Sequence, residues 1–409
     1  MNELSWRLGI LMKSFDHNSN IYVSHFVGLR GVGGVQRNFV EYINNQTTSS
    51  NSLSHKVYTL GEVDSQYKIP VEVYDIKNLR NLFSLILDIV SRKKIVHFYN
   101  NLTSLKVVVF LLFLPVKNLI LHERGTIWNF PSYRRVLLQF VAWKSSLILT
   151  NSNATKIMLE KKFYVSSNKI RVLYNGIDTT IKCAKKKLRN DQLSTFYVGF
   201  IGRLDTPKGV HVLIDAMHHL ASERVKLIIA GTGILENALK EQAKNLENIS
   251  FIGRVKDPYR FLNSLDLLVV PSIREPLGNV CLEAGLCKTP VLAANVDGIP
   301  EIVENKVSGE LIYATVEISI NSPEGAVPFP EFVVDPVFNK LRTPKQIDSS
   351  LLARKILELS LDHDKLKNYS DKLHDKVVKY FNLERYTHDL HNIYFELGDC
   401  TFQNIRKKT

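Results

Sequence analysis

The chain has 409 residues, 45% apolar and 23% charged, which is the composition of a globular protein long enough for two or more domains. Its four cysteines are widely spaced with no CxxC pair, which argues against a zinc site and a disulfide framework and favours a reducing cytosol. The N-terminus lacks the charged-then-apolar pattern of a signal peptide.

Positive charge is concentrated in the first half of the chain. The net charge is +13, yet residues 1–190 hold 27 Lys and Arg against 11 Asp and Glu, whereas the remainder holds 26 against 29. This asymmetry indicates an anionic partner for one domain. No zinc-finger, RNA-binding or helix-turn-helix pattern accompanies the charge, so we do not expect nucleic acid. An anionic membrane surface or a phosphate-bearing acceptor fits better.

Short apolar runs alternate with helical or loop sequence through the first half. The run at 21–26 leads through the glycine loop "VGLRGVGG" into a helical pattern. The longest run, "VVVFLLFLPV" at 107–116, is too short to span a bilayer and predicts a buried helix or strand. Such runs indicate a parallel sheet covered on both faces. The predicted strands are 21–26, 56–60, 94–99, 118–123, 146–152 and 169–178.

A charged, aperiodic stretch at 179–195 predicts a linker, after which the same alternation restarts. Helices are expected at 209–220, 235–245 and 279–287. The predicted strands of this half are 196–202, 225–231, 249–255, 265–272, 290–295 and 309–313.

Two segments of the second half depart from this rhythm. Residues 314–347 are punctuated by proline and too long for an ordinary connection, so they predict either a lid or a small β insertion. Residues 349–396 are helical by periodicity, with Phe381, Tyr386 and Tyr394 as expected anchors.

The sequence therefore predicts two doubly wound, Rossmann-like α/β domains facing each other across a cleft. Ligands of such sheets bind beyond the carboxyl ends of the strands. We place the first domain at 1–185 and the second at 186–380. A C-terminal helical segment at 381–409 is expected to pack back on the first domain.

The stretch "PSIREPLGNVCLEAG" carries two acids around a tight apolar corner. The chain turns at Gly278 and enters a helix near Asn279. The first backbone N–H groups of a helix have no partner within it and can donate hydrogen bonds to phosphate oxygens. Glu275 and Glu283 lie eight positions apart, and a diphosphate would repel both carboxylates. We therefore expect them to accept hydrogen bonds from hydroxyls on either side of it. A nucleotide-sugar has such hydroxyls at both ends, on the sugar and on the ribose.

Two cations follow the first predicted strand of the second half. Arg203 and Lys208 stand in "GFIGRLDTPKGV", and the fork of arginine and the point charge of lysine both suit phosphate. Taken singly, each would more often pair with a surface acid. Together with the helix start, they favour a diphosphate site.

The second half resembles the large retaining glycosyltransferase family of GT-B fold, of the family 4 type, which includes many bacterial hexosyl- and mannosyltransferases. The matches span about 150–315, and the E-x7-E pattern is highly specific in that context. They are "NSNATKIMLE…IRVLYNGID", "IGRLDTPKG", "AGTG", "FIGRV", "VPSIREPLGNVCLEA" and "PVLAANVDGIPEIVENKVSGELI".

The resemblance implies a role for each matching residue. Glu275 would contact the hydroxyls of the donor sugar, and Glu283 the ribose. Arg203 and Lys208 would hold the diphosphate and stabilise it as the leaving group, and Arg254 lies where the family's pocket surrounds the base. Backbone amides would touch sugar and phosphate at Leu277, Gly278 and Asn279.

In the first half, the resemblance implies an acceptor domain. Gly33 and Gly34 match a glycine pair that approaches the donor phosphate, although such a loop alone also marks dinucleotide sites and turns. His122 in "LILHERG" matches a histidine that faces the cleft, where a neutral imidazole could hydrogen-bond sugar or acceptor. His97 is the competing candidate, since a lone histidine ending a strand is as often structural.

The resemblance also bears on mechanism. It implies that no metal or other cofactor is needed, and no D-x-D motif follows a strand; two cations would do the work of a metal. Retaining hydrolases use a nucleophilic carboxylate below the sugar, which nothing in the first half clearly supplies. We therefore expect reaction on a single face of the sugar, with the leaving phosphate helping to deprotonate the acceptor.

The expected function is retaining transfer of a sugar from a nucleoside-diphosphate sugar to a saccharide or a lipid-diphosphate-linked saccharide. The expected setting is bacterial surface-polysaccharide synthesis (lipopolysaccharide, O-antigen or capsule), in the cytoplasm and peripheral on the inner face of the inner membrane. Three alternatives stay open. They are an oxidoreductase binding NAD through "GLRGVGG" and Glu62, a non-catalytic protein that binds an anionic polymer or surface, and another GT-B enzyme such as a nucleotide-sugar epimerase.

Overall fold

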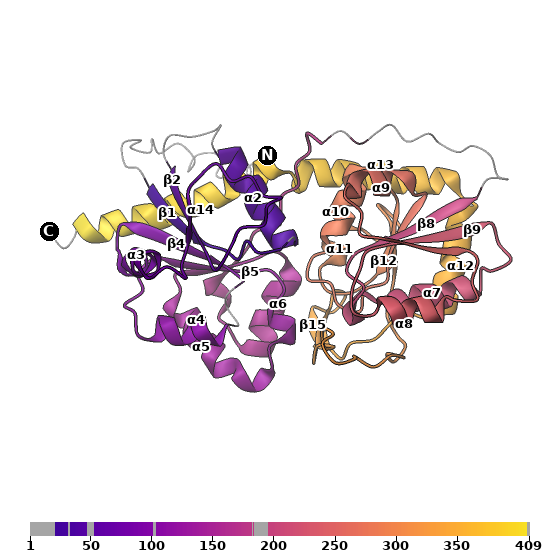
Figure 1. Cartoon of the computed structure of the whole chain (residues 1–409), viewed down its shortest axis with the longest axis horizontal. Coiled ribbons are helices and arrows are strands. Elements are labelled where there is room, and N and C mark those ends of the chain that lie inside the picture. The colour runs from indigo at the N-terminus through magenta and orange to yellow at the C-terminus, as the bar shows by residue number, and fades with distance from the viewer. Residues whose placement is uncertain are drawn as a thin grey trace, which may run out of the picture.

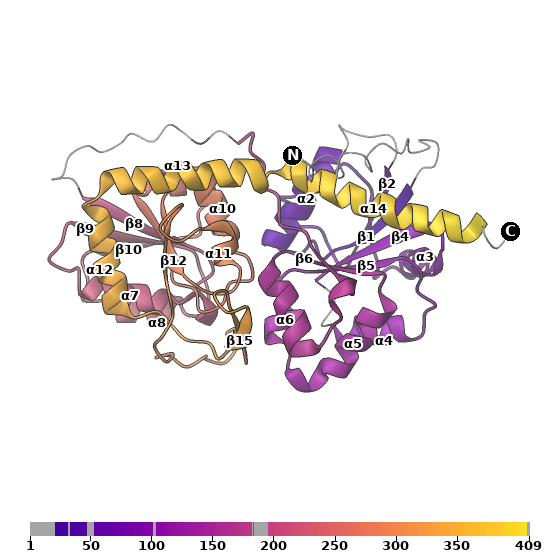
Figure 2. The same cartoon turned by 180° about the vertical axis from the view of Figure 1, so that it is seen from behind.

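The computed structural model describes residues 21–31, 33–46, 53–100, 104–181, 183 and 195–406, which form two α/β domains lying side by side (Figures 1 and 2). Each domain is built on its own parallel sheet, so the predicted doubly wound, two-domain architecture is confirmed. Most of the predicted linker lies outside the described residues, as do residues 1–20.

The first domain contains a seven-stranded parallel sheet in the order β3-β2-β1-β4-β5-β6-β7. The chain runs outward from β1 to β3 and returns to β4 on the other side of β1, so the strand order reverses between β1 and β4. Ligands of open α/β sheets bind outside such a reversal. All six predicted strands are present, and β3 was not predicted. The strands are β1 (Ile21–Phe26), β2 (Leu53–Thr59), β3 (Val73–Asp75), β4 (Lys94–Tyr99), β5 (Leu119–Glu123), β6 (Leu147–Thr150) and β7 (Ile170–Val172).

Helices cover both faces of this sheet, because successive strand residues point to opposite sides. Ile95 and Tyr99 of β4 pack with α2 and α14, whereas Val96 and Phe98 face the core formed by α3, α4, α5 and α6. The helices of the domain are α2 (Gly34–Gln46), α3 (Leu79–Val90), α4 (Leu105–Leu112), α5 (Arg135–Lys144) and α6 (Asn153–Phe163), with short 3-10 turns at Ile127–Asn129, Ser132–Arg134 and Ser167–Lys169.

Helix α4 corrects the prediction made for the longest apolar run. Val108 and Leu111 are buried against the sheet, as expected. Val109 and Phe113 are exposed, so a wholly buried element is wrong for this run. The physical reason is that α4 has only one side on the sheet and α5, and a uniformly apolar run does not reveal which side faces water.

The second domain contains a six-stranded parallel sheet in the order β10-β9-β8-β11-β12-β13. Its strand order reverses between β8 and β11, and all six predicted strands are present. The strands are β8 (Phe196–Ile201), β9 (Val225–Ala230), β10 (Ile249–Gly253), β11 (Leu267–Val270), β12 (Val291–Ala294) and β13 (Glu310–Ile312).

The helices of the second domain share one hydrophobic core with this sheet. Helix α10 packs on α13, and α7 packs on α12 (Figure 2). The three predicted helices correspond to α7, α8 and α10. The bounds are α7 (Val210–His218), α8 (Glu236–Gln242), α9 (Pro258–Ser264), α10 (Asn279–Leu286), α11 (Ile299–Ile302), α12 (Ser349–Ser360) and α13 (His363–Tyr380), with a 3-10 turn at Thr206–Lys208.

The segment 314–347 contains an antiparallel hairpin of β14 (Val333–Asp335) and β15 (Lys340–Arg342), in agreement with the β-insertion alternative. The hairpin contacts α6 of the first domain, and Val334 is buried in that domain's core. Nearby, the Glu331 carboxylate accepts a hydrogen bond from Ser132 and lies 3.2 Å from the Lys162 ammonium. The insertion therefore connects the second domain to the first.

Helix α14 (Leu383–Arg406) returns from the second domain and lies along the first (Figures 1 and 2). Tyr386 and Tyr394 are buried in the first domain and Phe381 in the core of the second, which confirms the three predicted anchors. The domain boundaries drawn from the sequence stay a prediction. No helix in the described part of the chain is long and apolar enough to cross a bilayer.

Candidate active site

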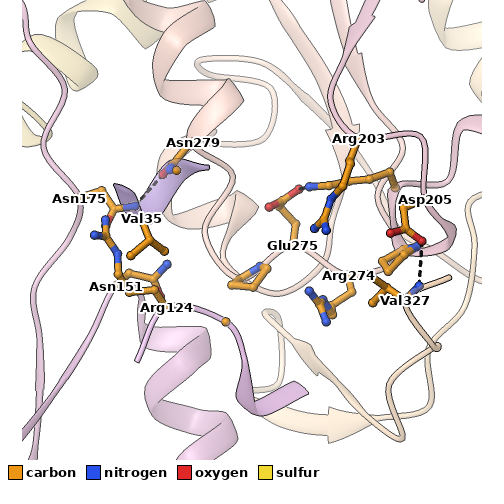
Figure 3. Close-up of a pocket in the computed structure, with 15 residues that line it drawn as sticks. Val35, Arg124, Asn151, Asn175, Arg203, Asp205, Arg274, Glu275, Asn279 and Val327 are labelled. Atoms are coloured by element: carbon orange, nitrogen blue, oxygen red, sulfur yellow. Dashed lines mark hydrogen bonds and ion pairs between the residues drawn. The ribbon is translucent and has the colours of Figure 1, made fainter. Parts of the chain in front are cut away.

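A cavity of about 240 Å³ lies between the two domains (Figure 3). Its walls are the loops that follow β1, β5, β6 and β7 in the first domain and β8 and β11 in the second. These loops all leave the carboxyl ends of parallel strands, where α/β sheets bind ligands. Val327 of the insertion completes the wall, and its N–H donates to Asp205.

Glu275 lies in this cavity with its side chain against a lysine. It is only 8% exposed, and its Oε2 accepts a hydrogen bond from Lys208 Nζ at 2.6 Å and from Ser272 Oγ at 3.2 Å. Because the acid follows β11 and the lysine follows β8, the neighbouring strands at the sheet reversal bring the two together. A ligand phosphate that attracts Lys208 would leave the carboxylate free to accept other hydrogen bonds.

Asp297 holds the Glu275 loop in place. One of its carboxylate oxygens accepts from the Glu275 N–H at 2.9 Å, and the other accepts from Val334 N–H at 2.6 Å and Trp128 Nε1 at 3.2 Å. Burial raises the pKa of Asp297 to about 6, opposed by these N–H donors. This side chain therefore joins the acidic loop, the insertion and the first domain at one point.

Four cations line the cavity, two of which the sequence predicted. Arg203 and Lys208 follow β8, and the side chain of Arg203 has no hydrogen-bond or ion-pair partner among the described residues. The other two, Arg124 and Arg274, were missed. Only their positions in the sequence could have indicated a place at the cavity: Arg124 follows the predicted strand 118–123, and Arg274 is next to Glu275.

Arg124 is a buried guanidinium without a carboxylate partner among the described residues. Its Nη2 donates to the side-chain oxygens of Asn38 (2.8 Å) and Asn175, whereas its buried Nη1 has no partner. Burial lowers the pKa of this group. Arg274 is similar, with Nη1 donating to Asn129 of the first domain at 2.6 Å and a buried Nε left unpaired. Unpaired buried cations of this kind are costly unless an anion binds them.

The start of helix α10 forms another wall. Gly278 has φ of +96°, a conformation that disfavours other residues, and it is the residue before the helix. Asn279 lines the cavity and accepts from Asn175 Nδ2 at 2.6 Å. Gly34 approaches so closely that a Cβ there would lie 2.7 Å from Asn279 Nδ2. Leu277 is buried beneath this wall.

The second glutamate lies farther along α10, outside the cavity lining. Glu283 Oε1 is 2.7 Å from Arg37 Nη1 of α2, an ion pair that joins the two domains. Burial raises the pKa of Glu283, and the Arg37 charge opposes the shift. Burial also raises the pKa of the neighbouring Glu41, to about 7. The two acids of the E-x7-E pattern therefore have different partners in this structure.

His122, Gly33 and Arg254 also lie outside the cavity lining, as do Leu277 and Gly278. His122 is buried, stacked on His97 with ring centroids 5.3 Å apart, and neither of its ring nitrogens has a partner among the described residues. Burial, and then the charge of Arg124, lower the pKa of His122, so the imidazole is neutral. His97 contacts Tyr394 instead (2.7 Å). Gly33 and Arg254 are exposed.

No group of three or more His, Cys, Asp or Glu side chains in the described ranges is arranged to hold a metal ion. The positive charge of the cavity comes from the four side chains above and from the N–H groups at the start of α10. The arrangement can therefore bind an anion beside one acid and several amide groups.

A family model matches the sequence of the second domain, and solved structures match the fold of both domains. Residues 195–319 match the family described as glycosyl transferases group 1. The capsular polysaccharide biosynthesis glycosyltransferase CapM of Staphylococcus aureus is 31% identical over 180 residues, which cover 40% of this chain and 47% of that protein. A Campylobacter jejuni N-acetylgalactosamine-N,N'-diacetylbacillosaminyl-diphospho-undecaprenol 4-alpha-N-acetylgalactosaminyltransferase is 30% identical over 171 residues, covering 41% and 46%. The chain spans about half the length of these curated relatives.

Among solved structures, Anabaena HepE in complex with UDP-glucose superposes with a TM-score of 0.70. The superposition covers 92% of this chain and all of that one, at 22% sequence identity. A likeness of this kind concerns the fold, and it extends over both domains.

Proposed function

We propose a function from one premise: this chain has the GT-B fold, and its second domain belongs to the glycosyl transferases group 1 family. The resemblance to GT-B glycosyltransferases of the family 4 type, predicted from the sequence, is thereby confirmed. The proposed activity is transfer of a sugar from a nucleoside-diphosphate sugar to a saccharide or lipid-diphosphate-linked saccharide. The observation that carries it is Glu275 held between Lys208 and the start of α10 in the cavity between the domains.

The donor would be bound mainly by the second domain. Arg203, Lys208 and the N–H groups at the start of α10 surround a space suited to a pyrophosphate. Binding would draw Lys208 towards the phosphates and release the carboxylate of Glu275, which then accepts hydrogen bonds from hydroxyls of the sugar. The complex of HepE with UDP-glucose supports a nucleotide-sugar as the ligand class.

The remaining donor contacts are proposals of the same kind. Glu283 would bind the ribose. This requires that its ion pair with Arg37 opens, or that the ribose hydroxyls contact the Glu283 carboxylate while the pair stays formed. Arg254, which is exposed beyond β10, would lie beside the base. The amides of Leu277 and Gly278 would approach sugar and phosphate from the same side as Asn279.

The acceptor would bind on the first-domain side of the cavity. Gly33 and Gly34 would approach the donor phosphate there, and His122, which is buried close to Arg124 in the sequence but outside the cavity lining, stays as the proposed partner of sugar or acceptor. Arg124 has an unpaired, buried Nη1, which supports an acceptor that carries phosphate near the reacting hydroxyl. The printed names of the two relatives, one acting in capsule synthesis and one on a diphospho-undecaprenol saccharide, support surface-polysaccharide synthesis.

We propose retention of configuration without a metal. The two carboxylates that line the cavity, Asp205 and Glu275, come from the second domain, and Asp205 already accepts from Thr206 and Val327 N–H groups. The leaving pyrophosphate would be stabilised by Arg203, Lys208 and the helix start, and one of its oxygens would take the proton of the attacking hydroxyl. The enzyme would work in the cytoplasm, in peripheral contact with the inner face of the membrane.

Donor binding gives the first test. At a donor concentration of a hundred times Kd, a ligand that binds only the native state adds about 2.7 kcal/mol of stability. We therefore expect one of a panel of nucleoside-diphosphate sugars to raise the melting temperature by a few degrees, equally with and without a chelator. The matching nucleoside monophosphate, which lacks the bridging pyrophosphate, should give a clearly smaller shift.

The same panel separates the alternatives. If no nucleoside-diphosphate sugar stabilises the chain, or if NAD does so instead, the proposed function is wrong. Product analysis with and without an acceptor distinguishes a transferase from an epimerase, since only the latter converts the donor alone.

A further inference from the structure

Helix α4 exposes one complete apolar face. Leu105, Val109 and Phe113 are four residues apart, and therefore lie on one side of the helix, and they are 52%, 45% and 83% exposed. Val108 and Leu111, on the other side, are buried. An α-helix at a domain surface usually presents polar residues to water, so this face is unusual for a soluble surface.

Helix α5 packs beside α4 and repeats the pattern (Figures 1 and 2). Val136 and Trp143, seven residues apart on one face, are 67% and 69% exposed, while Leu138 and Val141 are buried. Tyr133, just before the helix, is also exposed. We call the exposed side chains of the two helices the α4–α5 surface, comprising Leu105, Val109, Phe113, Tyr133, Val136 and Trp143.

The charge around this surface is mainly positive. Residues 89–159 include ten Lys and Arg but a single acid, Glu123, whose carboxylate is buried and accepts N–H groups of its own loop. Lys106, Lys117 and Arg135 are exposed on the two helices and the segment between them. The structure does place one acid from outside this stretch beside the surface: Glu331 accepts a hydrogen bond from Ser132, next to Tyr133, and lies 3.2 Å from the Lys162 ammonium, which offsets its charge.

We propose that the α4–α5 surface docks on an anionic lipid bilayer. Aliphatic and aromatic side chains would enter the headgroup region, where tryptophan and tyrosine are favoured, and the lysines and arginines would contact lipid phosphates. A protein partner matches this combination less well, because protein interfaces are depleted in lysine.

The chain links this surface to the cavity. Gly125 lines the cavity, and the two 3-10 turns that follow lead directly to Tyr133 and α5. A bilayer at the α4–α5 surface would therefore contact the same domain that supplies the first-domain side of the cavity. The docking rests on and deepens the proposed function, which already has the enzyme in peripheral contact with a membrane, and it would bring a lipid-linked acceptor to its site.

Vesicle flotation of the full chain tests the inference. The chain should float with vesicles of phosphatidylglycerol and phosphatidylcholine, and stay in solution with phosphatidylcholine alone or at high salt. The triple variant Val109→Glu, Phe113→Glu, Trp143→Glu should reduce the bound fraction about tenfold or more. A matched variant of the second domain, Val337→Glu, Phe338→Glu, Leu361→Glu, alters equally exposed apolar positions by the same charge and should float like the wild type.

Trp143 supplies a second readout. In a Trp6→Phe background, which removes the tryptophan that lies outside the described residues, its emission should shift to shorter wavelength with anionic vesicles. Adding Trp143→Phe should remove the shift, because Trp128 is buried. The inference is overturned if the wild type does not bind anionic vesicles, or if the first triple variant floats as well as the wild type. It is also overturned if the wild type forms a dimer without lipid and this variant is a monomer, because the surface would then be a dimer interface. No donor or acceptor is present, so the outcome is independent of the donor-binding test.

Discussion

Replacing Glu275 with alanine is expected to lower the rate of sugar transfer by at least about a hundredfold while the protein stays folded. A charge-assisted hydrogen bond contributes about 1.5–3 kcal/mol, and a carboxylate that holds two sugar hydroxyls in the transition state would contribute twice that. The fold should tolerate the change, because the charged side chain left without a partner, Lys208, is partly exposed and can reach water, and the other donor, Ser272, is a neutral hydroxyl. Initial rates at saturating donor, with a melting curve for each protein, measure both effects.

The control for this variant is Glu236→Ala. Glu236 belongs to the same domain and also pairs with a lysine, Lys240, at 2.7 Å, but it lies on the outer helix α8. Its loss should leave the transfer rate unchanged. Full activity of the Glu275→Ala protein would refute the role assigned to this carboxylate.

Removing both phosphate-facing cations should have the largest effect on donor use. Loss of one group that stabilises developing negative charge typically costs about 10²–10³ in rate. We expect Arg203→Ala and Lys208→Ala each to lower kcat/KM for the donor in this range. The double variant should fall further but by less than the product, since both side chains act on one pyrophosphate.

Matched variants separate this effect from a general loss of positive charge. Lys240→Ala and Lys244→Ala remove the same two charges from the surface of the same domain. Their double variant should keep its kcat/KM. If the Arg203→Ala, Lys208→Ala protein stays within threefold of the wild type, the pyrophosphate does not bind where we place it.

Local sequence patterns predicted the sheets because each parallel strand is buried on both faces and appears as a short apolar run. The missed strand, β3, has only three residues, all partly exposed, and leaves no such run. The same logic placed Glu275, Lys208, Arg203 and Asn279 at the cavity, since loops after neighbouring parallel strands meet at one edge.

The features that escaped prediction depend on contacts between distant segments. The ion pair of Glu283 with Arg37 crosses from one domain to the other, and Val327 reaches the cavity from an insertion without periodicity. Arg124 follows a predicted strand, but nothing local distinguishes a cavity arginine from a surface one. The exposed face of α4 was missed because its residues are apolar on every side, so burial depends on what packs against the helix.

The account as a whole depends on where the pyrophosphate lies, and a crystal structure with an intact nucleoside-diphosphate sugar measures this directly. We predict phosphate oxygens within hydrogen-bond distance of Arg203, Lys208 and the N–H groups at the start of α10, with the Lys208–Glu275 contact broken and the carboxylate on a sugar hydroxyl. A donor bound elsewhere on the chain, or one whose sugar leaves Glu275 still paired with Lys208, would contradict the account.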